Sequence, residues 1–111
     1  ALTIAGITID PARRRVKRDG EEIDLTQKEF DLLYTLMREK GRVLTREQLL
    51  KRVWQTNYLG DTRTVDVHIR YLRQKIEYEP SNPQYILTVR GVGYSFCEDE
   101  DSEKVEEEEG N

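Results

Sequence analysis

The first 25 residues alternate apolar and polar side chains, which is the period of a β-strand with one buried face. The apolar positions of this region are Leu2, Ile4, Ile7, Ile9, Val16 and Ile23. Turn formers separate them at Gly6, Asp10-Pro11 and Asp19-Gly20, where glycine and aspartate favour tight reversals of the chain. The pattern predicts a small antiparallel sheet at the N-terminal end.

From residue 25 onwards the apolar positions follow the period of an α-helix. A core-facing side with the spacing i, i+3, i+4, i+7 is formed by Phe30, Leu33, Tyr34 and Met37. Thr26 with Glu29 three residues later forms a capping box, which satisfies two backbone N–H groups at a helix start. The helix is therefore predicted to begin at Thr26 and to end at Gly41.

A second helix is predicted directly afterwards, because Thr45 and Gln48 repeat the capping box. Its buried side consists of Leu49, Leu50 and Val53, and it is predicted to end near Trp54. Residues 55–62, QTNYLGDT, have no helical period and contain several turn formers, so they are predicted to be an exposed loop.

The third predicted helix has two faces of opposite character. One face is an apolar stripe of Val65, Ile69, Leu72 and Ile76, which requires a protein core. The opposite face collects Arg63, Val67, Arg70 and Gln74, flanked by Asp66 and Tyr71. The helix is predicted to start between residues 61 and 64 and to continue to Glu79, because Pro80 and Pro83 follow.

Two strand-like runs follow, Tyr85 to Val89 and Tyr94 to Cys97, separated by Arg90-Gly91-Val92-Gly93. They predict a hairpin with a glycine-rich tip that carries one arginine. The string GVG is not a dinucleotide-binding motif, since that motif requires a third glycine and a following helix.

The charges of the chain are divided unevenly along its length. The 111 residues have a formal net charge of −4, which by itself argues against a nucleic-acid ligand. Residues 98–111 hold nine acidic residues and one lysine, net −8, so residues 1–97 with 13 acidic and 17 basic side chains are net +4. We expect one globular domain over residues 1–97 and a disordered acidic tail over 98–111. The tail is interpreted either as a solubilising segment or as a competitor of DNA phosphates.

The residue inventory argues against several classes of protein. No run approaches the 18 apolar residues of a membrane span, and no secretory signal is present. The missing initiator Met indicates an excised chain, and a cytoplasmic location is expected. The single cysteine, Cys97, excludes an internal disulfide and a zinc site built on cysteine pairs. His68, the only histidine, has no nucleophilic partner at a meaningful spacing, so no enzyme, metal or cofactor is expected.

The outer side of the third helix suits the major groove of DNA. Arginine can read guanine, glutamine can read adenine, and an aliphatic group such as Val67 can touch a thymine methyl. Arg90 at the hairpin tip can enter the minor groove. Phosphate contacts are expected from Thr88, Tyr94, Arg73 and His68.

Other interpretations of these side chains stay open. The charged helix face could be solvated and tied by the pairs Asp66–Arg70 and Arg73–Glu77. The exposed Val67 and the loop residues Tyr58 and Leu59 could instead serve a winged-helix protein-interaction module without specific DNA binding. The basic cluster at residues 13–18 is interpreted as a solvated strand face, with DNA contact as the alternative.

Four segments together resemble a known family. LTQKEFDLL, LTREQLLKRVW, RTVDVHIRYLRQKI and TVRGVGY resemble, in this order and spacing, the C-terminal effector domain of OmpR/PhoB-type response regulators. The resemblance covers about residues 2 to 97. It implies an α+β fold, a winged helix-turn-helix with a four-stranded N-terminal antiparallel sheet, three helices and a C-terminal β-hairpin wing.

The resemblance also implies positions that contact DNA. In the recognition helix, predicted over residues 63–79, they are Arg63, Asp66, Val67, His68, Arg70 and Arg73, with Tyr71 and Gln74 on the same exposed side. In the wing they are Thr88, Arg90 and Tyr94, and the DNA backbone is contacted by Trp54 and Thr64. The polymerase-contact loop comprises Gln55, Asn57, Tyr58, Leu59, Gly60 and Asp61. Tyr71 stands where the activator pattern has a base-contacting arginine, and Val92 replaces a threonine, so base preference is not transferred.

The partners that the resemblance implies are those of a phosphorelay output domain. They are double-stranded DNA with tandem direct repeats, RNA polymerase, a receiver domain in the full-length protein and its sensor kinase. The isolated domain is expected to be a monomer in solution and a head-to-tail dimer on DNA. No membrane association is expected.

Overall fold

The computed structural model describes residues 1–55 and 61–98 of the chain, and its first element is a four-stranded antiparallel sheet. Its strands β1 (Leu2–Ile4), β2 (Ile7–Asp10), β3 (Arg15–Arg18) and β4 (Glu21–Ile23) lie side by side in sequence order. Ala5-Gly6 and Asp19-Gly20 reverse the chain with positive φ at both residues, the conformation of tight hairpin turns. The predicted sheet and two of its turns are thereby confirmed.

Two helices begin at the predicted capping boxes. Helix α1 (Gln27–Arg38) is capped by Thr26, whose hydroxyl accepts from the Glu29 N–H while the Glu29 carboxylate accepts from the Thr26 N–H. Helix α2 (Arg46–Trp54) repeats this arrangement with Thr45 and Gln48. The local sequence signal therefore sets both starting points correctly.

Helix α3 (Arg63–Ile76) buries the predicted stripe, with Val65, Ile69, Leu72 and Ile76 at most 1% exposed. The helix ends at Ile76 instead of the predicted Glu79. Glu77 has an extended backbone, and its buried carboxylate accepts the N–H groups of residues 84, 85 and 86. A further helical turn would remove this carboxylate from the chain segment that it caps, so the helix ends three residues before the position expected from Pro80.

A second sheet contains strands β6 (Ile86–Val89) and β7 (Gly93–Phe96), with the short strand β5 (Leu44–Thr45) on the other side of β7. The predicted hairpin is confirmed, although β6 begins one residue later than predicted and β7 begins and ends one residue earlier than predicted. A Cβ on residue 93 would lie 2.0 Å from the Leu44 carbonyl oxygen, so only glycine fits where β5 pairs with β7. The third strand was not predicted.

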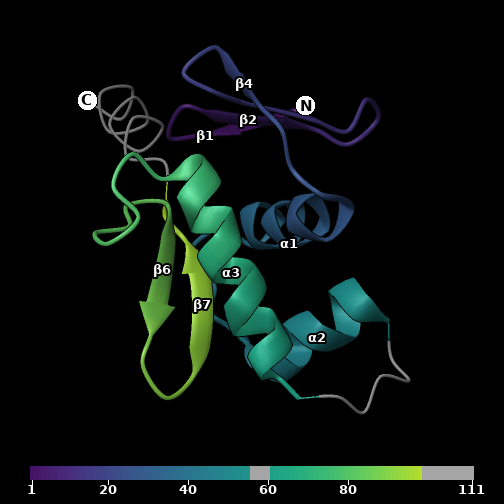
Figure 1. The fold of residues 1–111 in the computed structure, drawn as a ribbon, viewed down its shortest axis with the longest axis vertical. Coiled ribbons are helices and arrows are strands. Elements are labelled where there is room, and N and C mark those ends of the chain that lie inside the picture. Colours follow the sequence, from purple (N-terminus) through teal and green to yellow (C-terminus); the bar gives the residue numbers. More distant parts are fainter. Residues whose placement is uncertain (56–60, 99–111) are drawn as a thin grey trace, which may run out of the picture.

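The elements form layers around one core (Figure 1). Helix α1 lies beneath the four-stranded sheet, and α3 runs from that region towards α2 with the hairpin β6–β7 beside it. The core joins the inward residues of both sheets, such as Ile7 and Phe96, to those of the three helices. In the described part of the chain, no helix is long and apolar enough to cross a membrane.

Candidate nucleic-acid interface

The side of α3 that faces away from the core carries a continuous set of exposed side chains, which we call the outer face. It consists of Arg63, Val67, Arg70, Tyr71 and Gln74, which the helical period brings to one side. Val67 is 45% exposed and Tyr71 is 49% exposed. Within residues 1–55 and 61–98, Arg70 makes no hydrogen bond or ion pair. The outer face therefore has donors and apolar groups available to a ligand.

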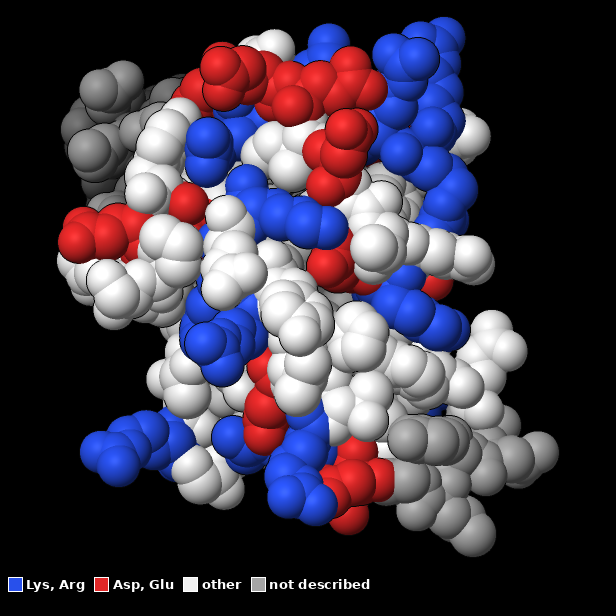
Figure 2. All heavy atoms as spheres, viewed as in Figure 1, with Lys and Arg blue, Asp and Glu red and all other residues white. Residues whose placement is uncertain are grey.

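Basic side chains lie at both ends of this view of the molecule. Figure 2 shows Lys and Arg at the tip of the hairpin β6–β7 and over the lower part of α3, and a second group over the N-terminal sheet, where most of the Asp and Glu of this view also lie. Arg90 lies in the exposed turn between β6 and β7. The cations on α3 and at the hairpin tip are therefore accompanied by fewer carboxylates than those of the sheet, which favours a polyanion at this end.

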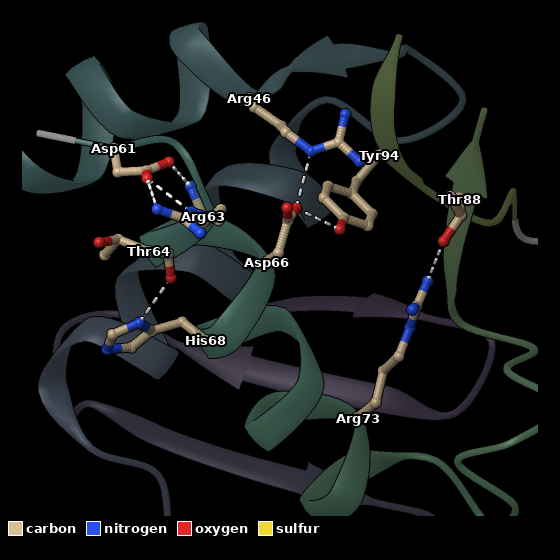
Figure 3. A network of polar contacts seen from close by, with 9 residues as sticks. All are labelled: Arg46, Asp61, Arg63, Thr64, Asp66, His68, Arg73, Thr88 and Tyr94. Atoms are coloured by element: carbon tan, nitrogen blue, oxygen red, sulfur yellow. Dashed lines mark hydrogen bonds and ion pairs between the residues drawn. The ribbon is translucent and has the colours of Figure 1, made fainter. Parts of the chain in front are cut away.

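The first turn of α3 is organised by local polar contacts (Figure 3). Asp61 accepts from the backbone N–H of Arg63 at 2.9 Å and forms an ion pair with its guanidinium. The backbone hydrogen bond and then the guanidinium lower the pKa of Asp61. The His68 Nδ1 lies 2.9 Å from the Thr64 carbonyl oxygen. These contacts place Arg63, Thr64 and His68 around the N-terminal end of the helix.

Trp54, at the end of α2, packs edge-on against the His68 ring with the ring centroids 4.8 Å apart. The Lys28 ammonium lies 5.8 Å from the Trp54 ring centroid and donates to the carbonyl of Val53. The structure thereby brings Trp54 and His68, which were predicted to make separate contacts, into one cluster. Of the predicted loop, Gln55 caps α2, while Asn57, Tyr58, Leu59 and Gly60 lie outside the described residues.

Asp66 does not belong to the outer face, because its carboxylate is held by two protein donors (Figure 3). The Arg46 Nε donates to Asp66 at 2.7 Å and the Tyr94 hydroxyl donates at 2.6 Å. The contact with Asp66 raises the pKa of Arg46, and burial together with this hydrogen bond raises the pKa of Tyr94. Asp66 therefore ties α2, α3 and β7 together.

Arg73 lies on the same side of α3 as Asp66, and its side chain reaches the hairpin. Its guanidinium donates to the Ile86 carbonyl at 2.8 Å and to the Thr88 hydroxyl at 2.7 Å. It also lies over the Tyr94 ring, 5.6 Å from the centroid. Burial lowers the pKa of Arg73, yet a guanidinium stays charged at neutral pH. We call Asp66 and Arg73, together with Glu77 directly after the helix, the hairpin-facing side of α3.

These contacts correct the alternative of i, i+4 pairs along α3. Asp66 pairs with Arg46 rather than Arg70, and the Glu77 carboxylate accepts backbone N–H groups rather than pairing with Arg73. Both carboxylates accept from donors on other elements of the fold. On the outer face Arg63 pairs with Asp61, but Arg70 is left without a carboxylate partner among the described residues.

Arg46 is the functional side chain that sequence reasoning missed. It stands 20 residues before Asp66 in the chain, and neither helix period nor capping pattern links two positions so far apart. Its place in the first turn of α2, next to the capping threonine, carries no signal of its own. Only the packing of α2 against α3 brings the pair together.

The basic cluster of the N-terminal sheet is partly committed to protein partners. Arg14 pairs with Asp31 at 2.8 Å, and Arg18 donates to the Ile76 carbonyl at the end of α3 at 2.9 Å. This supports the interpretation of a structural and solvated strand face. The cluster also lies at the opposite end of the molecule from the hairpin tip (Figure 1).

Three helices, a four-stranded antiparallel sheet and a C-terminal hairpin with a neighbouring exposed helix define the class of winged helix-turn-helix domains. Residues 20–96 match the family model described as transcriptional regulatory protein, C terminal. The chain belongs to this family, the DNA-binding domains of OmpR/PhoB response regulators. DNA binding and transcription regulation are the functions of the family.

Solved structures support this assignment. The DNA-binding domain of Klebsiella pneumoniae RstA, in complex with the RstA box, is 38% identical with a TM-score of 0.79, covering 86% of this chain and 95% of that chain. The OmpR/PhoB homologue DrrB of Thermotoga maritima is 38% identical with a TM-score of 0.80, covering 86% of this chain and 43% of that chain.

A streptococcal redox sensor evolved from two-component response regulators is 48% identical with a TM-score of 0.78, covering 86% of this chain and 41% of that chain. The chain thus spans about two fifths of the length of these longer relatives, since the covered shares are 41% and 43%. The remaining parts of those proteins have no counterpart among these 111 residues.

Proposed function

We propose that the domain binds double-stranded DNA in a sequence-specific manner, with α3 in the major groove and Arg90 in the adjacent minor groove. The observation that carries this proposal is the outer face of α3, where Arg70 has no protein partner among the described residues. An α-helix with side chains is about 10–12 Å wide, which matches the major groove width of about 12 Å. Arg70 and Gln74 then face base edges.

The hairpin supplies the second contact. Arg90 is exposed in the turn, and Gly91 with a φ of 78° lets the chain reverse there. Arginine is favoured in a narrow minor groove because the electrostatic potential there is most negative. Arg73 holds the hairpin strand β6 against α3, which fixes the spacing between the major-groove and minor-groove contacts before DNA is bound.

Side chains around the two groove contacts suit phosphates. Arg63, Thr64, His68 and Trp54 lie together at the end of α3 that is nearest α2. Thr88 is exposed on β6, while Tyr94 is buried to 5% exposure and holds Asp66. We therefore assign Trp54, Arg63, Thr64, His68 and Thr88 to the DNA backbone, and Asp66, Arg73 and Tyr94 to the support of the interface.

The similarity to response regulators extends the proposal to partners. The domain is proposed to act as the output of a phosphorelay, joined to a receiver domain that a sensor kinase controls. It would be a monomer alone and bind tandem direct repeats as a head-to-tail dimer, in the cytoplasm. The segment from Gln55 to Asp61 is proposed to contact RNA polymerase, although residues 56–60 lie outside the described part of the chain. Tail residues 99–111 also lie outside the described part of the chain.

The test compares two arginines of the interface on one target. A duplex that the domain binds is first selected from a random pool, and affinity is then measured for Arg70→Ala and Arg90→Ala over a range of salt concentrations. Arg70→Ala should lose about 1–3 kcal/mol of discrimination against a mismatched site. Arg90→Ala should weaken binding and reduce the salt slope by about one unit.

Arg13→Ala serves as the control, because Arg13 is an exposed arginine in the turn between β2 and β3 of the N-terminal sheet and does not lie on α3 or the hairpin. It should leave the affinity and its discrimination between sites unchanged. Equal binding of the cognate duplex by the parent, Arg70→Ala and Arg90→Ala would contradict the proposed interface. Binding that does not depend on salt would favour a protein-docking module instead.

A further inference from the structure

Two large apolar side chains are exposed next to each other on α3. Val67 is 45% exposed and Tyr71 is 49% exposed. They stand at positions i and i+4, so they lie on one face and about 6 Å apart along the helix axis. Single exposed apolar residues are common on protein surfaces, but this pair lies in the middle of the surface proposed to meet DNA.

The surroundings of the pair are polar and cationic. On the helix surface, Arg63, Arg70 and Gln74 border Val67 and Tyr71. Among the described residues, the Tyr71 hydroxyl forms no hydrogen bond, so the ring is not fixed to the protein by its polar end. Arg63 pairs with Asp61 just before the helix and Asp66 is held by Arg46 and Tyr94, whereas Arg70 has no partner among the described residues. An apolar centre bordered by donors and by one unpaired cation fits a polyanion that displays apolar groups.

The major groove of DNA has one apolar group, the C5 methyl of thymine. Arginine at position 71 would present a fork of donors to guanine, whereas a phenol ring has no such fork and offers an apolar face. We propose that Val67 and Tyr71 form a methyl-reading pair that selects thymine, or another 5-methylpyrimidine, within the DNA site. This inference rests on the proposed binding of α3 in the major groove.

The pair differs from the other exposed apolar residues by its position. Val43 precedes β5, Tyr78 follows the end of α3, and Leu87 and Val92 belong to the hairpin, so none of the four lies on α3. Only Val67 and Tyr71 are large, exposed and apolar on the helix that would face base edges. The two positions together would read methyl groups about two base steps apart, given a rise of about 3.4 Å per step.

The experiment removes single methyl groups from the DNA. In the selected duplex, each thymine is replaced in turn by deoxyuridine, which keeps the base pair and lacks only the C5 methyl. The affinity of the parent should fall about fourfold at each methyl that is read, as expected for one buried methyl group. In Val67→Ala and Tyr71→Ala, the loss at the corresponding position should disappear, because the group that contacts the methyl is absent.

Two further variants separate the methyl contact from other effects. Tyr71→Phe should keep the sensitivity to deoxyuridine, because the ring rather than the hydroxyl makes the contact. Val43→Ala removes an equally apolar exposed residue away from α3 and should also keep it. Thermal unfolding of all variants should match the parent, since both side chains of the pair are exposed.

The outcomes distinguish this inference from the proposed function. If a specific duplex is bound but no deoxyuridine substitution changes the affinity, the methyl-reading pair is wrong while groove binding stands. If the methyl effects persist in both alanine variants, another part of the protein reads the methyls and the inference also fails. If no duplex is selected at all, the proposed function fails and the inference with it.

Discussion

The outer face and the hairpin-facing side of α3 use the same residue types for different purposes. Arg70 and Arg73 are three residues apart and about 60° apart around the helix. Arg70 is exposed without a partner among the described residues, whereas Arg73 donates to Ile86 and Thr88 of the hairpin. A rotation of about 60° thus separates a side chain available to a ligand from one that stabilises the fold.

The difference concerns how the fold holds the two surfaces that we propose to contact DNA. Asp66 ties α3 to α2 and β7, and Arg73 ties it to β6. Both contacts fix the angle between helix and hairpin before any ligand binds. Preorganisation of this kind lowers the conformational cost of association. Under the proposed function, the hairpin-facing side would act on DNA binding through geometry, and the outer face would act through contact.

The largest expected effect concerns Glu77 at the end of the hairpin-facing side. Its buried carboxylate accepts the backbone N–H groups of Gln84, Tyr85 and Ile86. Glu77→Ala would leave these groups without an acceptor, and each unsatisfied buried group costs about 1–3 kcal/mol. We expect a loss of about 3 kcal/mol in the free energy of unfolding, measured by urea denaturation.

Glu77→Gln is the matched control, because the amide keeps one oxygen acceptor at the same position. It should lose about 1 kcal/mol, well below the alanine variant. An alanine variant as stable as the parent would show that the base of the hairpin does not depend on α3. Glu77 would then no longer count among the residues that stabilise the hairpin from α3.

The second prediction compares Arg73→Ala with Arg70→Ala in two measurements, the free energy of unfolding by urea denaturation and the affinity for the selected duplex. Arg73→Ala should lower the free energy of unfolding by about 2 kcal/mol, because two charge-assisted hydrogen bonds to the hairpin are lost. Arg70→Ala should change it by less than about 0.5 kcal/mol, the usual range for an exposed residue. DNA affinity should fall for both variants.

The two losses of affinity should differ in kind. For Arg70→Ala, the loss should depend on the base sequence of the site, whereas for Arg73→Ala it should be similar for cognate and mismatched duplexes. Arg73→Lys, which keeps the charge but lacks the fork of donors, should restore only part of the stability. Equal unfolding curves for the two alanine variants would remove the contrast between the sides of α3.

Sequence patterns predicted the parts of this molecule that depend on near neighbours. The capping boxes join residues three positions apart, and Thr26 and Thr45 both start helices as predicted. The apolar stripe of α3 likewise follows from the helical period alone. Such signals are contained in a few consecutive residues, so no knowledge of the packing is needed to interpret them.

The roles of the polar side chains on α3 required the packed structure. Asp66 finds its partners 20 and 28 residues away, in Arg46 and Tyr94. Glu77 leaves the helical conformation directly after Ile76, and its carboxylate accepts the N–H of Ile86 in the following strand, nine residues away. The sequence alone does not show whether an aspartate or arginine on a helix surface binds other parts of the protein or contacts DNA. Asp66, Arg70 and Arg73 were therefore all predicted to contact DNA.

The smallest expected effect tests the side of α3 that faces α1. Glu29 is 3% exposed, and its carboxylate accepts from the Lys75 ammonium of α3 at 2.6 Å. Burial alone raises the pKa of Glu29, but the hydrogen bonds from Lys75 and from the Thr26 N–H outweigh it, so the pKa lies below its ordinary value of 4.5.

The depressed pKa of Glu29 gives a definite direction for the pH dependence of stability. The contribution of Glu29 is fully present above the ordinary value of 4.5 and is lost as the pH falls through the lower pKa of the folded state. Urea denaturation should show Glu29→Gln about 1 kcal/mol less stable than the parent at pH 7, with the difference shrinking below pH 4.5.

Lys75→Met decides whether the α3 ammonium is the cause. In this background the difference between glutamate and glutamine at position 29 should be smaller and less dependent on pH, because the strongest of the contacts that lower the pKa is gone. An unchanged pH profile would assign the effect to the capping contact with Thr26 alone. The side of α3 that faces α1 would then stabilise the fold through its apolar stripe. The hydrogen bonds and ion pairs that stabilise the fold through α3 would be those of the hairpin-facing side.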